Sequence, residues 1–337
     1  MLWCYIVELV ADVLGGYPRS TRLRKALRRL EERGEAELTE VQRIIYEETL
    51  VVVGAQLGAG MYSVVDGMLD WHDPLRPFAE AWRGVYIDGL LRWFDNNFFY
   101  RIPVFVEEPD PKRLVLAPRV RMLRSILPDW ARIRVVVPGP YTFTKLSKNR
   151  TGRDDRELMG LIAKLLAEEV RRAVEAGASV VQVDEPMFAD VDAKPDEASE
   201  AVEAINTVFK AAGSTETRLA IPYNVPSPDV YERILDVKAR TIILDFVDAF
   251  ERGLKLVKEK GVGGHELGAG IIEARNIYIE PYERFASQLD AIISVYNGDR
   301  LLITTSTWLD LIPPHYAIEK TKILGCYTAR YSSAGAR

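Results

Sequence analysis

The sequence predicts an α/β protein, a single (β/α)8 barrel of the TIM type with a small extra β-hairpin inserted after the second strand. Short apolar runs rich in β-branched residues alternate with longer segments whose apolar residues recur at helical spacing. Several of the short runs stop at an acid, a glycine or a proline, as parallel strands do where their loops begin. The chain has 337 residues, 48% of them hydrophobic, which suffices for the core of a barrel of about 250 residues or more.

Eight segments outside the hairpin have the length and composition of parallel strands that are buried on both faces. They cover residues 6–14, 61–65, 133–137, 179–183, 218–221, 241–244, 266–272 and 301–304. Helical patterns fill the intervals, at residues 20–33, 39–56, 118–127, 154–176, 197–212, 228–237, 250–260, 282–295 and 317–324. No linker or low-complexity segment interrupts this alternation, so we expect residues 1–337 to form one barrel domain.

The stretch from residue 71 to residue 117 is the least regular part of the chain. It begins with a segment rich in aromatic residues, and two short strand-like runs then flank the turn-forming sequence Glu108-Pro109-Asp110-Pro111. These runs predict the hairpin insertion at residues 100–117. At the other end of the chain, the small and polar residues of 331–337 predict a flexible tail.

Composition argues against several classes of function. The net charge is −5 and the lysines and arginines are dispersed, which argues against a general nucleic-acid surface. Cys4 and Cys326 are the only cysteines, and their wide separation argues against a thiolate metal site or a disulfide scaffold. We therefore expect a reducing, cytoplasmic location. The apolar first 14 residues contain acids and are too short to span a bilayer, so no membrane association is expected.

The strand at residues 179–183 ends at two adjacent carboxylates and a proline, Asp184-Glu185-Pro186. Barrel enzymes place their substrate-facing loops at the carboxyl ends of the strands, so this end marks the candidate active face. Asp184 and Glu185 are the candidate catalytic residues. The alternative is that Asp184 is a structural acid, paired with a neighbouring arginine or lysine of the barrel.

Five stretches at the ends of predicted strands form a set that spans nearly the whole chain. They are Gly16-Tyr17-Pro18-Arg19, Arg92-Trp93-Phe94-Asp95-Asn96-Asn97-Phe98-Phe99-Tyr100, Gly139-Pro140-Tyr141-Thr142, Gln182-Val183-Asp184-Glu185-Pro186 and Gly268-Ala269-Gly270-Ile271-Ile272-Glu273-Ala274-Arg275-Asn276. In this order they resemble the cobalamin-independent methionine synthase family, which transfers a methyl group to homocysteine to give methionine. The resemblance implies a barrel of the same fold. Full-length members join two such barrels, and the motifs here are closest to the first, zinc-free barrel.

The same resemblance implies where zinc ligands would stand. The zinc barrel of the family carries a His-x-Cys, a glutamate and a late cysteine; the matching places here hold Pro222-Tyr223-Asn224, Asp245 and about Thr307. Zinc needs three protein ligands of imidazole, thiolate or carboxylate type, so we expect no metal and no cofactor in this chain. Zinc would be supplied by a partner barrel. The three histidines, His72, His265 and His315, share no ligand spacing.

The candidate substrate-binding residues also stand at predicted strand ends or in family motifs. They are Tyr17, Arg19, Asp66, Trp93, Asn96, Asn97, Tyr141, Tyr223, Asn224, Asp245 and Glu273. The acids and amides could hydrogen-bond a polar ligand, or satisfy the backbone of turns. Trp71, Trp93 and Trp308 could form a stacking platform, or pack the barrel against the hairpin.

Two further points come from the resemblance. The aspartate that matches Asp184 holds the amino group of homocysteine in the zinc barrel. Basic residues in the region of Arg19, Arg22, Arg24 and Lys25 are associated with the glutamyl tail of the folate donor, although a solvated helix face is the simpler interpretation.

Two hypotheses of different class follow. In the first, the chain is a methionine-synthase-like methyltransferase component, a donor-binding or accessory barrel that works with a separate zinc-bearing barrel. In the second, it is a non-catalytic ligand-binding or scaffold barrel of the same family. The expected ligands are a pterin or folate, an amino acid, or a methylated corrinoid protein.

Overall fold

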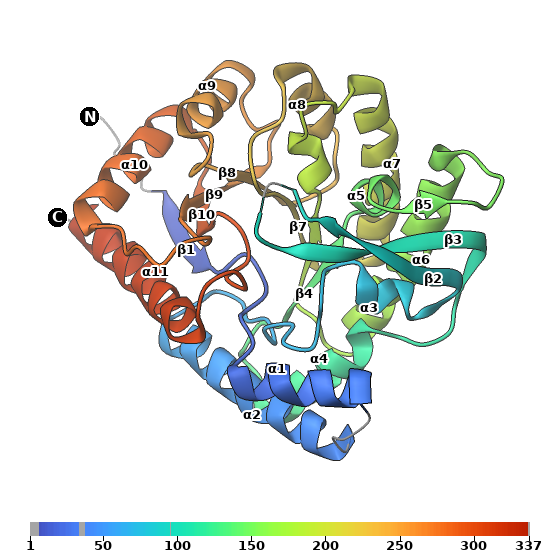
Figure 1. Ribbon diagram of the computed structural model, residues 1–337. Helices are drawn as coiled ribbons and strands as arrows, with labels where there is room; N and C mark the ends of the chain where they lie inside the picture. The colour runs from blue at the N-terminus through green and yellow to red at the C-terminus, as the bar shows by residue number, and fades with distance from the viewer. Residues whose placement is uncertain (1–6, 34–37, 95, 336–337) are drawn as a thin grey trace.

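The computed structural model describes residues 7–33, 38–94 and 96–335, and a curled, seven-stranded parallel sheet forms its centre (Figure 1). The strand order is β1 (Glu8–Asp12), β10 (Arg300–Thr305), β9 (Glu266–Ile272), β8 (Thr241–Asp245), β7 (Glu216–Ile221), β6 (Val180–Asp184) and β4 (Arg134–Pro138). The bounds of each of these strands agree with those predicted from the sequence to within two residues. The predicted α/β class is therefore confirmed.

The second predicted strand, at residues 61–65, differs from the others. It lies between β1 and β4, but its ladder is limited to one parallel bridge between Val64 and Ile133. The amide of Tyr62 donates to the carbonyl of Ala11 at 2.9 Å, whereas the next amide, that of Ser63, donates to the Asp12 side chain at 2.7 Å. Because that side chain takes the place of a backbone acceptor, regular pairing with β1 stops there. An eight-stranded closed barrel is thus not shown among the described residues.

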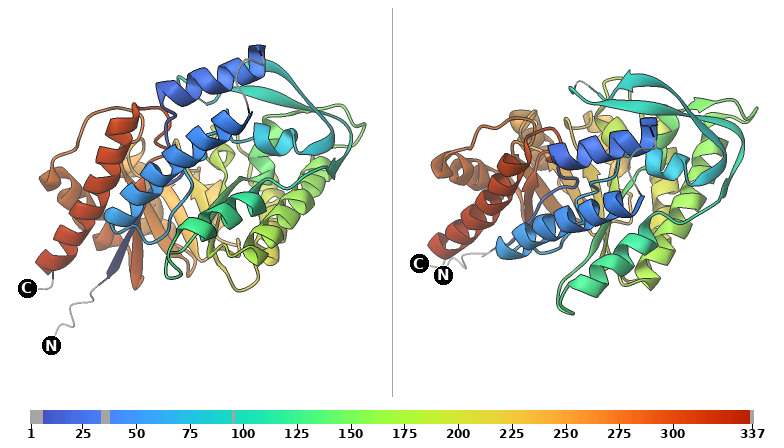
Figure 2. Two further views of the ribbon diagram at one scale, coloured as in Figure 1. Left: turned by 90° about the horizontal axis from the view of Figure 1, so that it is seen from below. Right: turned by 60° about the horizontal axis from the view of Figure 1, so that its bottom comes forward.

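Helices cover the outer face of the sheet (Figures 1 and 2). The longer ones are α1 (Thr21–Arg28), α2 (Leu38–Gly58), α4 (Leu116–Ile126), α6 (Asp155–Glu175), α7 (Pro195–Ala211), α9 (Phe250–Lys260), α10 (Tyr282–Val295) and α11 (Pro314–Gly335). The shorter ones are η1 (Arg29–Arg33), α3 (Arg76–Ala79), α5 (Pro140–Lys145), η2 (Pro186–Ala189) and α8 (Pro228–Ile234). Ser20 and Asp154 cap α1 and α6, each accepting from an amide in the first turn of its helix. None of the helices in these described ranges is long and apolar enough to cross a membrane.

The hairpin is longer, and begins earlier, than the predicted insertion at residues 100–117. Its strands are β2 (Trp82–Arg92) and β3 (Phe99–Pro111), and the short β5 (Lys148–Asn149) pairs with β3 to complete a second sheet. Residues 93–98 connect the two strands in sequence, while Glu108-Pro109-Asp110-Pro111 lies within β3. The two prolines are accommodated because the ladder has a register shift at Gly84, whose φ is +76°.

Within the predicted flexible tail at residues 331–337, α11 continues as far as Gly335. The hydroxyls of Ser332 and Ser333 donate to the carbonyls of Thr328 and Ala329, one helical turn earlier, at 3.0 and 2.9 Å. The serines of the tail therefore satisfy their hydroxyls within the helix. Residues 336 and 337 lie outside the described part of the chain.

The space inside the curled sheet is strongly polar. Arg218 is buried, and its guanidinium donates to Asp12 at 2.6 Å and to Glu216 at 2.8 Å. The ring of Tyr62 is covered by the guanidinium groups of Arg132 and Arg300, at 4.2 and 4.3 Å from its centroid. Buried charges are tolerated only when they are paired, so this network fixes how β1, β7 and β10 are positioned relative to one another.

Candidate functional site

The carboxyl ends of the strands meet at one end of the molecule, and two adjacent cavities lie there. The inner cavity, near the end of β6, has a volume of about 20 Å³, which is room for one water molecule. The outer cavity, beside the loop after β1, has a volume of about 430 Å³. Phe98, Trp308 and Asp310 line both cavities and form the wall between them. We call the region of these two cavities the mouth. The tip of the hairpin contributes to it through Phe98.

Asp184 ends β6 and lines the inner cavity. One of its carboxylate oxygens accepts from Nε2 of Gln182 at 2.7 Å, and the other accepts from Nε1 of Trp308 at 2.9 Å. Burial raises the pKa of Asp184 to about 6, while these two hydrogen bonds and the nearby charge of Arg134 act in the opposite direction. A carboxylate that titrates near neutral pH and faces a cavity is suited to binding a cationic group.

Gln182 and Arg134 hold Asp184 from below, and both are buried. The side-chain oxygen of Gln182 accepts from Arg134, and its amide nitrogen donates to the Leu14 carbonyl at 2.9 Å as well as to Asp184. Arg134 also donates to the Leu14 carbonyl, at 2.9 Å. Burial lowers the pKa of Arg134 to about 10. The three side chains thus link β4 and β6 to the residues that follow β1.

Glu185 points the other way, because successive side chains of a strand alternate between its two faces. Its carboxylate accepts from the amides of Tyr141 and Thr142 at 2.9 and 2.8 Å, and from the Thr142 hydroxyl at 2.5 Å. These groups belong to the first turn of α5, so Glu185 caps that helix. A Cβ on Gly139 would lie 1.9 Å from the Glu185 carboxyl carbon, so glycine is required there. Burial raises the pKa of Glu185 to about 7.

Trp308 closes the inner cavity from the side of β1. Its indole lies against Gly15 and Gly16, and a Cβ on Gly15 would be 2.1 Å from the indole nitrogen. The amide of Leu309 donates to the Gly16 carbonyl at 2.9 Å, which holds the Trp308 loop on this glycine pair. The two glycines therefore make room for an aromatic side chain.

Aromatic residues from the hairpin tip and the loop after β7 form the opposite wall. Nε1 of Trp93 donates to the Tyr223 hydroxyl at 3.1 Å, and the Tyr223 ring stacks on Phe94 with 5.2 Å between centroids. Tyr223 and Phe94 have φ angles of +75° and +49°, and Met68 across the mouth has +51°. No other non-glycine residue in the described ranges has a positive φ. Such strained backbone is concentrated at functional sites.

The outer cavity combines aromatic and charged side chains. Trp71 and Trp308 face it with 6.2 Å between their ring centroids, and Arg19, Arg24 and Asp310 also line it. Burial raises the pKa of Asp310 to about 7, and the charge of Arg19 opposes this shift. The outer cavity therefore offers two cations, a titratable acid and a stacking surface.

Several of the candidate substrate-binding residues form hydrogen bonds with the backbone or with neighbouring side chains. Asp245 accepts from the amides of Val247 and Tyr223 at 2.7 and 3.1 Å, and burial raises its pKa to about 7. Asn224 accepts from Arg252 at 2.7 Å. Glu273 accepts from the amide of Arg275 at 2.8 Å. These contacts are those of turn-forming residues.

Other candidate substrate-binding residues lie near the mouth, but their polar groups contact other parts of this chain. Tyr17 lines the outer cavity, but its hydroxyl forms a 2.7 Å hydrogen bond with Thr321 of α11. The Tyr141 hydroxyl donates to Glu197 at 2.8 Å. Asp66 pairs with Arg119 at 2.5 Å and lines a separate small cavity. At the hairpin tip, Asn96 is buried and donates to the Trp93 carbonyl at 3.4 Å, whereas Asn97 is exposed.

The structure adds groups that sequence reasoning did not select. Asp310 was missed because it stands six residues after the last predicted strand, although an acid in that loop facing a basic loop after β1 was a usable signal. Gln182 was missed as a partner of Asp184, although two residues of spacing in a strand puts both side chains on one face. Of the predicted basic cluster, Arg22 instead pairs with Glu47 at 2.7 Å.

Across residues 7–33, 38–94 and 96–335, no three His, Cys, Asp or Glu side chains are grouped so that they could hold a metal ion. The histidines serve other contacts. His265 hydrogen-bonds to the carbonyls of Ala239 and Leu235 at 2.8 and 3.0 Å, and His72 contacts Glu31 at 2.7 Å. His315 packs on Tyr316, with 4.2 Å between ring centroids. Cys4 lies outside the described residues, and Cys326 is exposed.

The geometry defines a class: an α/β protein with a curled parallel sheet and two cavities at the carboxyl ends of the strands. The particular family follows from comparison with known proteins. Residues 85–297 match the family described as cobalamin-independent synthase, N-terminal domain, and the chain belongs to this family. The predicted resemblance is thereby confirmed, and membership supports a methionine-synthase-like role.

Individual relatives of this chain carry the name methionine synthase. A methionine synthase from Saccharolobus islandicus is 27% identical over 312 residues, which cover 93% of this chain and 91% of that protein. A methionine synthase from Sulfurisphaera tokodaii is 26% identical over 313 residues, covering 93% and 89%. Among solved structures, a B12-independent methionine synthase from Shewanella sp. W3-18-1, in complex with selenomethionine, superposes with a TM-score of 0.78 at 18% identity, covering 97% of each chain. At that identity, the match shows a shared fold.

Proposed function

We propose that this chain is a methionine-synthase-type methyltransferase component whose mouth binds a methyl donor or an amino acid. In this proposal a separate zinc-bearing barrel supplies the homocysteine thiolate, and methyl transfer gives methionine. The family membership and the relatives named methionine synthase, which this chain matches over about nine-tenths of their length, support the reaction class. The cytoplasmic location and the absence of a resident cofactor remain predictions from the sequence.

The observation that carries the proposal is the pairing of two unlike cavities at one mouth. The outer cavity, at about 430 Å³, has the size of a small-molecule site, with a tryptophan surface for a flat ring and Arg19 and Arg24 for an acidic tail. Those features suit a pterin or folate better than a methylated corrinoid protein, which would need a larger open surface. The inner carboxylate, Asp184, suits an ammonium group.

In this proposal the chain contributes to methyl transfer by positioning the reacting groups and by excluding water. In an SN2 transfer the thiolate sulfur attacks the methyl carbon while the donor atom leaves with its electron pair, so the three atoms must be held in line. A donor that carries the methyl group on nitrogen also needs a proton on that nitrogen. Asp310, with a pKa raised to about 7, lines both cavities and is placed to hold that proton.

The test is reconstitution. The purified chain is mixed with a single-barrel partner that carries the zinc ligands, and methyl transfer from methyltetrahydrofolate to homocysteine is measured with and without this chain. We expect the rate to rise when the chain is added and to fall again for Asp310→Asn. If mixing produces neither a complex nor any gain in methyl transfer, the proposal is wrong.

One observation favours the second candidate, a non-catalytic ligand-binding or scaffold barrel. The inner cavity has room for only one water molecule, and both oxygens of Asp184 already accept hydrogen bonds from this chain. The scaffold function predicts that Asp184→Asn leaves methyl transfer by the reconstituted pair unchanged. A large loss of rate in that variant would exclude it.

A further inference from the structure

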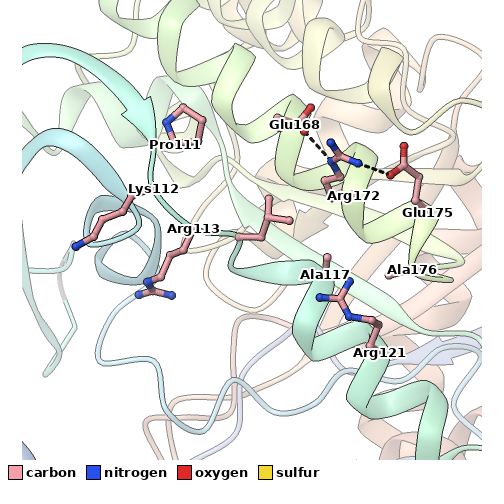
Figure 3. A pocket seen from close by; sticks show the side chains of 10 residues that line it. Pro111, Lys112, Arg113, Ala117, Arg121, Glu168, Arg172, Glu175 and Ala176 are labelled. Carbon is pink, nitrogen blue, oxygen red and sulfur yellow. Dashed lines mark hydrogen bonds and ion pairs between the residues drawn. The ribbon is translucent and has the colours of Figure 1, made fainter.

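A groove on the outer wall of the molecule lies apart from the mouth, at the base of the hairpin (Figure 3). It is bounded by the connection from β3 to α4, by the first half of α4 and by the last turns of α6. Its volume is about 520 Å³, within the range of sites for metabolite-sized ligands. Leu114, Ala117 and Ala176 contribute apolar surface. The groove is thus both large enough and amphipathic enough to hold a small organic molecule.

The acids of this groove are already neutralised. Glu168 and Glu175, both on α6, line it together with Arg172. Arg172 contacts Glu168 at 2.8 Å and Glu175 at 3.1 Å, and Arg171 contacts Glu168 at 2.7 Å (Figure 3 shows the Arg172 contacts). Two arginines therefore balance two glutamates, and this network leaves no net negative charge to repel an anion.

Three other cations line the groove without an ion pair of that kind, although the charge of Arg113 opposes the rise that burial causes in the pKa of Glu169. Lys112 and Arg113 lie on the loop after β3, and Arg121 lies on α4, so two elements contribute cations to the lining of the groove (Figure 3). In the described ranges, no carboxylate lies within ion-pairing distance of any of the three. Three like charges around one concave surface repel one another, and an anionic ligand would relieve that repulsion. This local group of positive charges contrasts with the net charge of −5 of the whole chain.

The surrounding helices show where the anionic groups would sit. The amides of Val115 and Leu116, at the start of α4, donate to the buried Glu169 at 2.9 and 3.0 Å, so that helix end is already occupied. The last turn of α6 ends at Ala176, and a helix carboxyl end carries partial negative charge. The anionic groups are therefore expected at the side chains of the loop and of α4, away from the end of α6.

We propose that this groove is a second ligand site, which binds a small organic polyanion bearing phosphate or carboxylate groups. Lys112, Arg113 and Arg121 contact the anionic groups, and Leu114 and Ala117 contact the apolar body. The site does not depend on the function proposed for the mouth. Because β3 runs from this groove to the hairpin tip that carries Trp93, an occupant would lie at one end of an element that lines the mouth at the other.

The experiment uses the full chain with two probes, inorganic pyrophosphate and citrate, each titrated by calorimetry at low and moderate salt. The test variant is Lys112→Glu with Arg121→Glu. The matched control is Lys164→Glu with Lys210→Glu, which makes the same change of net charge at exposed positions on α6 and α7 outside the groove. Thermal melts followed by circular dichroism establish that each variant is folded.

We expect at least one probe to bind the wild-type chain at least tenfold more tightly than the test variant, with the control within twofold of wild type. Binding should weaken as salt is raised. The probe that binds more tightly identifies the head group, phosphate or carboxylate. In the wild-type chain, amide shifts in NMR spectra should change around residues 111–121. Equal affinities of wild type and test variant, or shift changes centred on the mouth, would overturn the proposal.

Discussion

Asp184 and Glu185 are neighbours in sequence, yet they serve opposite faces of the sheet. Asp184 faces the inner cavity and accepts from two side chains, Gln182 and Trp308. Glu185 faces outward and accepts from the first turn of α5. The difference shows that an acid pair at a strand end need not be a catalytic pair, because strand alternation sends only one of the two toward the cavity.

The largest expected effect comes from the outward acid. Glu185→Ala leaves two buried amides and a hydroxyl without their acceptor, so the free energy of unfolding should fall by about 3 to 5 kcal/mol. Glu185→Gln keeps an acceptor oxygen and should cost about 1 kcal/mol. Urea unfolding measures both. A loss below about 1 kcal/mol for the alanine variant would show that the cap is not needed for stability.

The pH dependence of stability should follow from the buried carboxyls. The pKa is raised to about 6 for Asp184 and to about 7 for Glu185, Asp245 and Asp310, chiefly by burial. Acids with a raised pKa bind protons more tightly in the folded than in the unfolded chain, so their protonation stabilises the fold and this stabilisation is lost as the pH rises through 6 and 7.

We therefore expect the free energy of unfolding to be larger at pH 5 than at pH 7.5, with each group contributing about 1.4 kcal/mol per pH unit between pH 5 and its pKa in the folded chain. Denaturant unfolding across this range measures the difference. Asp310→Asn should flatten the profile, because it removes one of the titrating groups. Stability that is constant or rises toward pH 7.5 would contradict the raised pKa values.

The fit of Trp308 over the glycine pair can be tested by adding one methyl group. Gly15→Ala places a Cβ against the indole and should destabilise the chain by about 2 kcal/mol, with a red shift of tryptophan fluorescence as Trp308 leaves Asp184. Gly54→Ala is the matched control, because nothing lies within 4 Å of its Cβ and it sits within α2. That change should stabilise the chain by up to about 1 kcal/mol. Equal effects of the two substitutions would mean that Trp308 is not held in place by Gly15.

The smallest expected effect in free energy concerns the inward acid. Asp184→Asn should weaken the binding of an amino acid such as methionine at least tenfold, which corresponds to about 1.4 kcal/mol, because the ammonium group loses its charged partner. The same change removes a buried charge and should leave the free energy of unfolding unchanged or higher. Calorimetric titration and urea unfolding are measured on the same preparation. A destabilised variant with intact binding would reverse the roles of the two acids.

The sequence predicted the regular part of the fold well and the irregular part poorly. Runs such as Val180–Asp184 are apolar and β-branched on both faces, so their strand character and parallel pairing could be recognised locally. The hairpin depended on register shifts at Gly84 and between Asp88 and Leu91, which follow from long-range pairing. Its prolines therefore suggested a turn where a bulged strand lies. Likewise, the pairing of residues 61–65 with β1 is interrupted at the Asp12 side chain, which the local pattern of residues 61–65 does not reveal.

For the site, the sequence located the mouth and left the roles of its residues open. Asp184, Trp93, Tyr223 and Arg19 line the two cavities, as expected of residues at strand ends. Asp245, Tyr141 and Glu185 stand at equivalent positions along the chain, yet their polar groups satisfy backbone or side-chain partners. Which way a polar side chain turns depends on the donors that the fold brings near it. That information resides in the packing of α5, of the hairpin and of the loop after β10.

One measurement tests the division between the two acids most directly. The carboxyl carbons of Asp184 and Glu185 are titrated by NMR in the chain labelled with carbon-13, without a ligand and with saturating methionine. We predict that the ligand lowers the pKa of Asp184 from about 6, because its ammonium group stabilises the carboxylate, and leaves the pKa of Glu185 unchanged. A pKa of Asp184 that does not respond to the ligand, or a shift confined to Glu185, would contradict the account.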